Sequence, residues 1–468
     1  MFRGMDTRSK NPHMMNKLKF SVWAVLYLLP ISLMAQQYHR GLLLDEAKYN
    51  KVAKTAALAQ RSYTDLPRAH NLVQYAPKPG DQGPTGTCTA WAIAYGARTV
   101  LEAHSKGLTD KDQVTANTFS PSFIYNQIRL ESGCEEGTYI SDGLDLLSQY
   151  GASKFRDYGF ECHRDPGAEE FEQAENYRIQ GYKRLFDYES SNKILPVKKS
   201  IAGSHPVVFG MMCPDSFFDA GDVWNVNSLE YTNSHAGGHA VVVIGYDDDK
   251  YGGAFLIQNS WGTSWGNQGL TWIRYRDFNE FTFEAYELIP KAPLEVDLIG
   301  EITFLRSDQV PMTATYVDGS YKMDVPHKSG TQFRFYVKND APAYVYALGT
   351  DNTGKIFRIF PHREGISPYL GSSNSTLAFP DEEHFVQMDD TQGEDIFCVL
   401  YSKTELDLDR LIFSLENSSG DFREKLEYHF RDVLIPGNLI SFNEKEIAFT
   451  ARSGDRSIVP IIIKIDHL

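Results

Sequence analysis

Two patterns of hydrophobic positions divide the chain. In the first part, apolar residues recur at the spacing of helices, whereas short β-rich runs separated by Gly and Asp turns follow after about residue 200. The predicted helices lie at residues 42–60, 89–104, from 120 onward and 141–150, and the predicted strands at residues 206–211, 240–246, 254–258 and 270–275. Helices followed by antiparallel strands indicate an α+β domain.

A second, β-rich domain is expected after the proline-containing linker at residues 290–293. Its strand-like runs include residues 332–337, 343–348, 355–360 and 458–465, and two helices are expected near residues 406–415 and 422–429. The Asp-Asn-Thr-Gly run at residues 351–354 is typical of a hairpin turn. We therefore expect one domain over residues 66–290 and an accessory domain over residues 294–468.

The first 35 residues have the composition of a secretory signal peptide. Lys17 and Lys19 precede an uncharged apolar stretch, residues 20–35, which is shorter than the ~20 residues that cross a membrane. We therefore expect residues 1–35 to be a signal peptide, followed by a helical segment over residues 36–65. The protein would be exported to the periplasm, the envelope or the medium, with no membrane-spanning segment.

The charge balance excludes one large class of function. Lys and Arg total 46 against 61 Asp and Glu, a net charge of −15, whereas a nucleic-acid-binding surface is basic. The sequence has no phosphate-binding loop, dinucleotide fingerprint or paired-cysteine zinc spacing. The three acids at residues 247–249 are typical of an exposed hairpin turn. We expect neither a cofactor nor a metal.

Among the five cysteines, Cys88 has the setting of a nucleophile. A glycine-rich run, residues 83–87, precedes it, and a predicted helix follows it. A thiol at a helix N-terminus feels the positive end of the helix dipole, which favours the reactive thiolate. A lone cysteine is more often a small buried hydrophobic residue, so this candidate needs a base.

His239 is the candidate base because two glycines precede it and the apolar strand at residues 240–246 follows it. An imidazole there would sit at the start of a rigid strand, on a backbone thin enough for a substrate to approach. The alternatives are His235, in a polar loop, and His205, which precedes a strand but lacks the glycine pair.

Asn259 is the candidate third member of the site. It ends the strand at residues 254–258, and Ser260, Trp261 and a glycine follow it. A side-chain amide can accept the imidazole N–H and orient the ring without adding charge, and Trp261 would cover that hydrogen bond. A structural asparagine in a turn is the alternative for this residue taken alone.

Taken together, these motifs resemble the papain-like cysteine peptidases in order and in spacing. The resemblance covers about residues 66–289 and implies a fold in which a helical lobe faces an antiparallel β lobe. It implies that Cys88 is the nucleophile, His239 the base and acid, and Asn259 the residue that orients His239. Gln82, six residues before the cysteine, would supply the side-chain donor of an oxyanion hole.

Two positions depart from the close relatives of papain. The family usually has a cysteine three residues before the nucleophile, where Thr85 stands here, and a tryptophan directly after the nucleophile, where Thr89 stands. Trp261, in contrast, matches the family's shielding tryptophan. The departures indicate a divergent bacterial secreted member.

Thr85 also leaves Cys134 without the disulfide partner usual in the family. Cys162 is then its expected partner, the alternative being two free buried thiols. Cys213 and Cys398 are expected to remain unpaired core residues.

The sequence says less about the function of the two regions that flank the catalytic domain. The segment before residue 66 is too short for the family's long helical propeptide, so it either packs on the catalytic domain or acts as a shorter pro-segment. Residues 335–361 resemble a β-rich module of unknown function that is appended to catalytic domains in bacterial envelope proteins. This accessory domain is expected to bind an unknown envelope or protein partner.

The sequence therefore predicts an exported cysteine endopeptidase that acts on protein or peptide substrates. Two alternatives remain. A cell-wall amidase uses a similar Cys–His pair on a related scaffold, and a binding protein could carry an inert peptidase-like domain.

Overall fold

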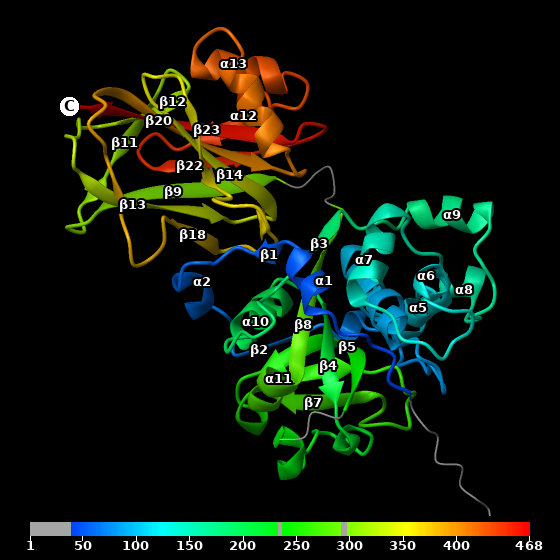
Figure 1. The fold of residues 1–468 in the computed structure, drawn as a ribbon. Coiled ribbons are helices and arrows are strands. Elements are labelled where there is room, and N and C mark those ends of the chain that lie inside the picture. Colours follow the sequence, from blue (N-terminus) through cyan, green and yellow to red (C-terminus); the bar gives the residue numbers. More distant parts are fainter. Residues whose placement is uncertain (1–38, 233–235, 292–296) are drawn as a thin grey trace, which may run out of the picture. The chain divides into compact units, whose positions relative to one another are not determined.

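The computed structural model describes residues 39–232, 236–291 and 297–468 (Figure 1). The predicted signal peptide, residues 1–35, and the alternative base His235 lie outside these ranges. Among the described residues, no helix has both the length and the apolar character needed to cross a membrane.

A helical layer occupies the first part of the described chain. Its helices are α1 (Glu46–Lys51), α2 (Arg61–Thr64), α3 (Cys88–Ala90), α4 (Thr99–Ser105), α5 (Lys111–Ala116), α6 (Pro121–Ile128), α7 (Ile140–Gln149), α8 (Phe155–Tyr158) and α9 (Ala168–Glu175). A π-helical stretch, Trp91–Arg98, joins α3 to α4, so one continuous helical segment begins at Cys88. Ser120 caps α6 by accepting a hydrogen bond from the Phe123 amide at 3.2 Å, as expected for serine before proline.

The prediction of a single helix over residues 42–60 is wrong. Asp45 caps α1, whose last residue is Lys51, and Val52 is already extended. The chain then forms strand β1 (Lys54–Thr55), which pairs with strands from two distant parts of the sequence. Sheet pairing has overridden the local helical periodicity here, because it satisfies the same backbone groups.

A nine-stranded sheet packs against the helical layer, in the order β16-β1-β3-β8-β4-β5-β6-β7, with β2 added beside β5. Its strands are β2 (Ala69–Asn71), β3 (Gly181–Arg184), β4 (Val207–Cys213), β5 (Gly237–Asp247), β6 (Ala254–Gln258), β7 (Leu270–Arg274), β8 (Thr282–Ile289) and β16 (Ile366–Ser367). Helices α10 (Ile194–Ala202) and α11 (Tyr275–Phe281) complete this part of the fold. The predicted strands at 206–211, 240–246, 254–258 and 270–275 fall on β4, β5, β6 and β7.

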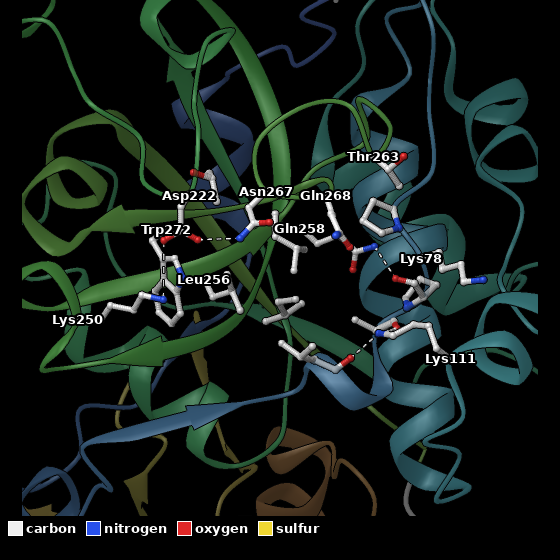
Figure 2. Close-up of a pocket in the computed structure, with 17 residues that line it drawn as sticks. Lys78, Lys111, Asp222, Lys250, Leu256, Gln258, Thr263, Asn267, Gln268 and Trp272 are labelled. Carbon is white, nitrogen blue, oxygen red and sulfur yellow. Dashed lines mark hydrogen bonds and ion pairs between the residues drawn. The ribbon is translucent and has the colours of Figure 1, made fainter.

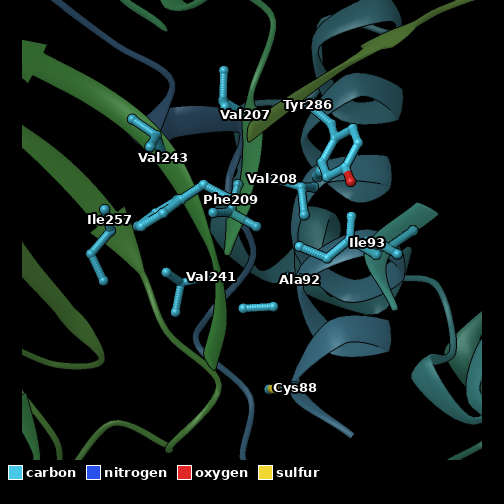
Figure 3. Packing of buried hydrophobic residues seen from close by; sticks show 14 of the residues in the cluster. Cys88, Ala92, Ile93, Val207, Val208, Phe209, Val241, Val243, Ile257 and Tyr286 are labelled. Atoms are coloured by element: carbon cyan, nitrogen blue, oxygen red, sulfur yellow. The ribbon is translucent and has the colours of Figure 1, made fainter. Parts of the chain in front are cut away.

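The helical segment that begins at Cys88 packs directly on the sheet (Figure 3). Ala92 and Ile93 face Phe209 of β4 and Val241 of β5, and all four are buried. At Gly96 a Cβ would lie 2.6 Å from the Val242 side chain, so glycine permits the close approach of helix and strand. This packing brings the start of the helix to the start of β5.

The C-terminal region forms two seven-stranded sheets. One contains β9 (Leu298–Arg306), β10 (Pro311–Met312), β13 (Gln332–Asn339), β18 (Ser375–Phe379), β19 (Val386–Gln387), β21 (Ile440–Phe442) and β22 (Ile447–Ala451). The other contains β11 (Ala314–Val317), β12 (Ser320–Met323), β14 (Ala343–Thr350), β15 (Ile356–Phe360), β17 (Tyr369–Leu370), β20 (Gly393–Ser402) and β23 (Ile458–His467). The two sheets share one hydrophobic core, to which Phe304 and Phe335 contribute from the first and Val399 and Ile463 from the second.

Several elements of this C-terminal region were predicted from the sequence. The turn at residues 351–354 joins the antiparallel pair β14 and β15, and the two expected helices are α12 (Leu408–Glu416) and α13 (Phe422–Phe430). The sheet of the first domain nevertheless continues across the expected boundary, because β1 pairs on one side with β3 and on the other with β16.

Candidate active site

The thiol of Cys88 is fully buried at the N-terminal end of α3. Its Sγ accepts a hydrogen bond from the Gly41 backbone amide at 3.3 Å. The glycine-rich run before it ends in Thr87, whose carbonyl accepts the Trp91 amide at 3.1 Å and thereby starts the helix on the residue before the cysteine. The helix position that the sequence predicted for this thiol is the position observed.

His239 and Asn259 lie side by side because their strands are neighbours in the sheet. His239 is on β5, Asn259 follows β6, and Val242 pairs with Gln258 in the antiparallel register between the two strands. His239 Nε2 lies 2.8 Å from Asn259 Oδ1, which also accepts the Ser260 amide at 2.8 Å. Because Asn259 Oδ1 can only accept, the imidazole carries its proton on Nε2 and presents Nδ1 as the free lone pair.

An aromatic group covers this pair. Trp261 stacks on the imidazole of His239 with ring centroids 4.5 Å apart and planes at 28°. Phe218 stacks in turn on Trp261 at 5.1 Å, and Phe217 contacts both Trp261 and Trp265. The hydrogen bond between His239 and Asn259 is therefore shielded from water, which strengthens it.

Gln82 lies next to this group through Ser260. Its backbone amide donates to the Ser260 carbonyl at 2.8 Å, and its Oε1 accepts the Ser260 hydroxyl at 2.6 Å. With Oε1 held in this way, Nε2 donates to the carbonyls of Thr85 at 2.6 Å and His39 at 3.3 Å. The structure thus joins Gln82, His239 and Asn259 in one hydrogen-bonded group, and the Cys88 thiol adjoins it through the amide of Ala240, the residue after His239.

A segment that the sequence reasoning did not assign to the site lies across it. Residues 39–43, here called the strap, run between the two lobes and over the thiol. The Leu42 amide donates to the Gly238 carbonyl at 3.1 Å, the Leu43 amide to the Thr138 carbonyl at 3.1 Å, and the Thr138 amide to the Gly41 carbonyl at 2.9 Å. The strap therefore occupies the cleft with backbone hydrogen bonds on both sides.

Glycines at the site make room for the strap. A Cβ on Gly238 would lie 2.4 Å from the Leu42 carbonyl oxygen, and one on Gly237 would lie 2.8 Å from the Arg40 side chain. A Cβ on Gly41 itself would lie 1.9 Å from the carbonyl oxygen of Gly86. The glycine pair before His239, which we expected to admit a substrate, was the only sequence signal for this contact.

Burial shifts the pKa values of Cys88 and His239. It raises the pKa of the Cys88 thiol, although the amides of Ala240 and Gly41 oppose the shift. It lowers the pKa of His239 to about 4, although the hydrogen bond to Asn259 opposes this. Both shifts favour a neutral thiol and a neutral imidazole near pH 7. The lower thiol pKa expected from the helix dipole is therefore not found while the cleft is covered.

Replacing Gly41 by alanine is expected to open the site. A methyl group cannot be placed beside the Gly86 carbonyl without displacing the strap, and a clash of this size costs about 1–3 kcal/mol. The rate at which iodoacetamide alkylates Cys88, measured by mass spectrometry of the tryptic peptide, should rise roughly tenfold or more. Gly221→Ala is the matched control, since a Cβ there meets no atom within 4 Å. Equal rates in the two variants would contradict this role of the strap.

The remaining cysteines are all buried or disulfide-bonded, and Cys213 interacts electrostatically with Cys88. Cys134 and Cys162 form a disulfide, and Cys213 and Cys398 are free and buried. The Cys134 carbonyl accepts the Gly86 amide at 2.6 Å, so the disulfide-bonded loop supports the glycine-rich run before Cys88. His205, the alternative base, instead pairs with the buried Glu287 at 3.1 Å.

A separate cavity of about 630 Å³ opens on the other face of β6 (Figure 2). Gln258, which precedes Asn259, lines it together with Leu256, and Lys250 reaches over the Trp272 ring at 4.4 Å. None of the four candidate catalytic residues lines this cavity. Gln258, the last residue of β6, thus lines this cavity, whereas the next residue, Asn259, contacts His239.

The fold and the site define a two-lobed cysteine peptidase domain. Residues 77–290 match the sequence model described as papain family cysteine protease. Residues 327–405 match a domain of unknown function, DUF4384. The predicted family, the α+β fold and the appended β-rich module are thereby confirmed.

The similar proteins come from several sources. An uncharacterised peptidase C1-like protein of Acanthamoeba polyphaga mimivirus is 30% identical over 42% of this chain and 64% of its own length. Mouse cathepsin K is 27% identical over 40% of this chain and 53% of its own length. The crystal structure of xylellain, a cysteine protease from Xylella fastidiosa, matches with 22% identity and a TM-score of 0.44, covering 54% of this chain and 96% of that chain.

Proposed function

We propose that this protein is an exported cysteine endopeptidase that hydrolyses peptide bonds through a Cys-His-Asn mechanism with a thiolate nucleophile. The observation that carries the proposal is the hydrogen bond between His239 and Asn259, shielded by Trp261, beside a thiol at the start of a helix. This arrangement gives the imidazole one fixed tautomer, with the lone pair of Nδ1 available to a proton. A structural histidine has no need of such a constraint.

In the proposed reaction, His239 Nδ1 takes the proton of Cys88, and Sγ attacks the carbonyl carbon of the substrate. The oxyanion receives hydrogen bonds from Gln82 Nε2 and the Cys88 backbone amide. The imidazolium then returns its proton to the leaving amine as the C–N bond breaks. Water, deprotonated by the same imidazole, hydrolyses the thioester and releases the acid and the free thiol.

Gln82 supports this scheme through its fixed orientation. Because Oε1 is held by the Ser260 hydroxyl, Nε2 is directed at the carbonyl of His39, a strap residue. The strap therefore already places a carbonyl oxygen on the donor proposed for the oxyanion. We propose that the covered state is latent and that the strap leaves the cleft before a substrate enters.

Export and the role of the accessory domain are further parts of the proposal. Residues 1–35 would direct the protein out of the cytoplasm, which suits the disulfide between Cys134 and Cys162. Residues 294–468 contain none of the four catalytic candidates, so we propose that they bind an envelope or protein partner and direct the enzyme to it. A bacterial source remains a prediction from the sequence.

A substrate panel distinguishes the peptidase from its alternatives. The full chain with Gly41→Ala would be incubated with a denatured protein and with purified peptidoglycan, and the products identified by mass spectrometry. A peptidase releases internal peptides from the protein, and an amidase releases amide-cleaved fragments from the cell wall. If neither product forms although Cys88 is accessible to alkylation, the result would support an inert binding domain and overturn the proposal.

A further inference from the structure

The floor of the cavity on the other face of β6 is one face of the sheet. Leu256 and Gln258 lie two residues apart on β6, so their side chains point to the same side of the sheet. Trp272 and Leu270, their partners on β7, point to that side as well. All four residues line the cavity (Figure 2). The floor is therefore an apolar surface that carries the amide group of Gln258.

One wall of the cavity is the segment over residues 76–79, whose backbone carbonyls hold two polar groups of the lining. The Pro77 carbonyl accepts a hydrogen bond from Gln258 Nε2 at 3.1 Å. The Ala76 carbonyl accepts one from Lys111 Nζ at 2.5 Å. Because consecutive Cα atoms are only about 3.8 Å apart, the Gln258 amide and the Lys111 ammonium are within reach of one small molecule.

The Gln258 amide is only half satisfied in the cavity. The Pro77 carbonyl can only accept a hydrogen bond, so the atom that faces it is the amide nitrogen. The amide oxygen, Oε1, has no hydrogen-bond partner among the described residues, and Gln258 is 5% exposed. Figure 2 shows this amide group pointing into the space between the lining side chains. A buried acceptor without a donor costs about 1–3 kcal/mol, so a ligand that donates a hydrogen bond here is favoured.

Lys111 adds a cation without a counter-ion. Its ammonium group donates to the carbonyls of Val73 at 2.7 Å and Ala76, and no carboxylate lies within 4.0 Å of it in the described part of the chain. An ammonium group has three N–H donors, so one remains for a ligand. The other lysine on this wall, Lys78, is already paired with Asp112 at 2.5 Å. Burial lowers the pKa of Lys111, and a bound carboxylate would oppose that shift.

We propose that this cavity binds the carboxy-terminal residue of a short peptide. The peptide carboxylate pairs with Lys111, the last backbone N–H donates to Gln258 Oε1, and an apolar side chain lies on Trp272 and the rest of the floor. In an N-acylated amino acid a single carbon atom separates the N–H group from the carboxylate, so this unit presents a donor and an anion together. A fatty acid lacks the donor, and a peptide amide lacks the anion.

The cavity adjoins the candidate catalytic site without being part of it. Gln258 precedes Asn259 in the chain, and the Gly80 carbonyl, one residue beyond the wall, accepts the Gly262 amide at 2.9 Å. Neither the four candidate catalytic residues nor the strap lines the cavity. A peptide can therefore occupy the cavity while the strap covers Cys88, and this site goes beyond the proposed function rather than depending on it.

The first test removes one recognition element of the ligand at a time. Binding of N-acetyl-L-phenylalanine would be measured by isothermal titration calorimetry to the full chain with Cys88→Ala, which also excludes turnover of the ligand. N-acetyl-L-phenylalaninamide lacks the carboxylate, and 3-phenylpropionate lacks the N–H group. Each of these two should bind more weakly than N-acetyl-L-phenylalanine by about tenfold or more. Equal affinities for the three, or no binding of N-acetyl-L-phenylalanine at about 10 mM, would overturn the inference.

The second test changes the cation. Lys111→Met removes the ammonium group and keeps a side chain of similar length, so it should lose the preference for the acid over its amide. Lys111→Arg should keep the preference, as should Lys51→Met, a change of an exposed lysine at the end of α1. The preference is a ratio measured on one variant, so a partly unfolded fraction lowers both affinities alike. A preference for the acid that is unchanged in Lys111→Met would overturn the inference. Neither measurement uses hydrolysis, so the outcome is independent of the proposed peptidase function.

Discussion

Replacing Cys88 by alanine should lower peptide hydrolysis by about 10⁴-fold or more and leave the fold intact. The thiol at the start of the helix is the group proposed to form the acyl intermediate, and catalysis without it is limited to binding and polarisation of the substrate. Alanine in place of a buried thiol removes little volume, so the circular dichroism spectrum should not change. Hydrolysis of coumarylamide peptides by the full chain with Gly41→Ala, with and without Cys88→Ala, measures the effect.

Alanine variants of His239 and Asn259 should show how much each of these residues contributes to hydrolysis. His239→Ala should be nearly as severe, because the proton of the thiol then has no acceptor. Asn259→Ala should be milder, since stacking against Trp261 still holds the imidazole. Near-normal hydrolysis by Cys88→Ala would show that the nucleophile lies elsewhere.

Replacing Glu287 by glutamine should destabilise the protein by about 3–5 kcal/mol near pH 7. The Glu287 carboxylate is buried and lies 3.3 Å from Lys183 Nζ and 3.1 Å from His205 Nδ1, and Lys183 is itself only 5% exposed. Lys183 also donates to the Tyr369 carbonyl at 3.2 Å, so the substitution leaves a buried cation with neutral acceptors only. Guanidinium unfolding followed by tryptophan fluorescence measures the loss.

The loss of stability caused by Glu287→Gln should depend on pH. Burial raises the pKa of Glu287, but Lys183 and the hydrogen bonds from His205 and Ser200 outweigh it and hold the pKa well below the usual range. A lowered carboxyl pKa stabilises the folded state above the unfolded-state pKa of about 4.3 and loses this effect as the pH falls further. The difference between wild type and Glu287→Gln should therefore be constant from pH 7 to 5 and shrink below about pH 4.

An exposed ion pair provides the control for this experiment. Glu394→Gln breaks the pair with Lys464 at 2.9 Å, in which both side chains are more than a third exposed. Its loss should change stability by less than about 1 kcal/mol. A comparable loss in the two variants would mean that burial does not set the strength of the Glu287 group.

Local patterns were sufficient for most elements of the fold. The β-branched runs at residues 240–246 and 254–258 predict strands, and the Ser-Pro pair at 120–121 predicts a helix start, because these signals act through the backbone of the same few residues. At residues 42–60 the local signal failed. There, pairing of β1 with β3 and β16 determines the conformation, and those partners lie far away in the sequence.

The candidate site divides in the same way. Cys88, His239 and Asn259 were identified from the sequence because each needs a particular neighbourhood in the chain: a helix start, a glycine pair before a strand, and an amide at a strand end. The position of the strap over Cys88 and the pKa shifts of Cys88 and His239 were decided by the tertiary structure alone. Both depend on burial and on contacts between residues more than 40 positions apart, such as Gly41 with Cys88, which no local pattern records.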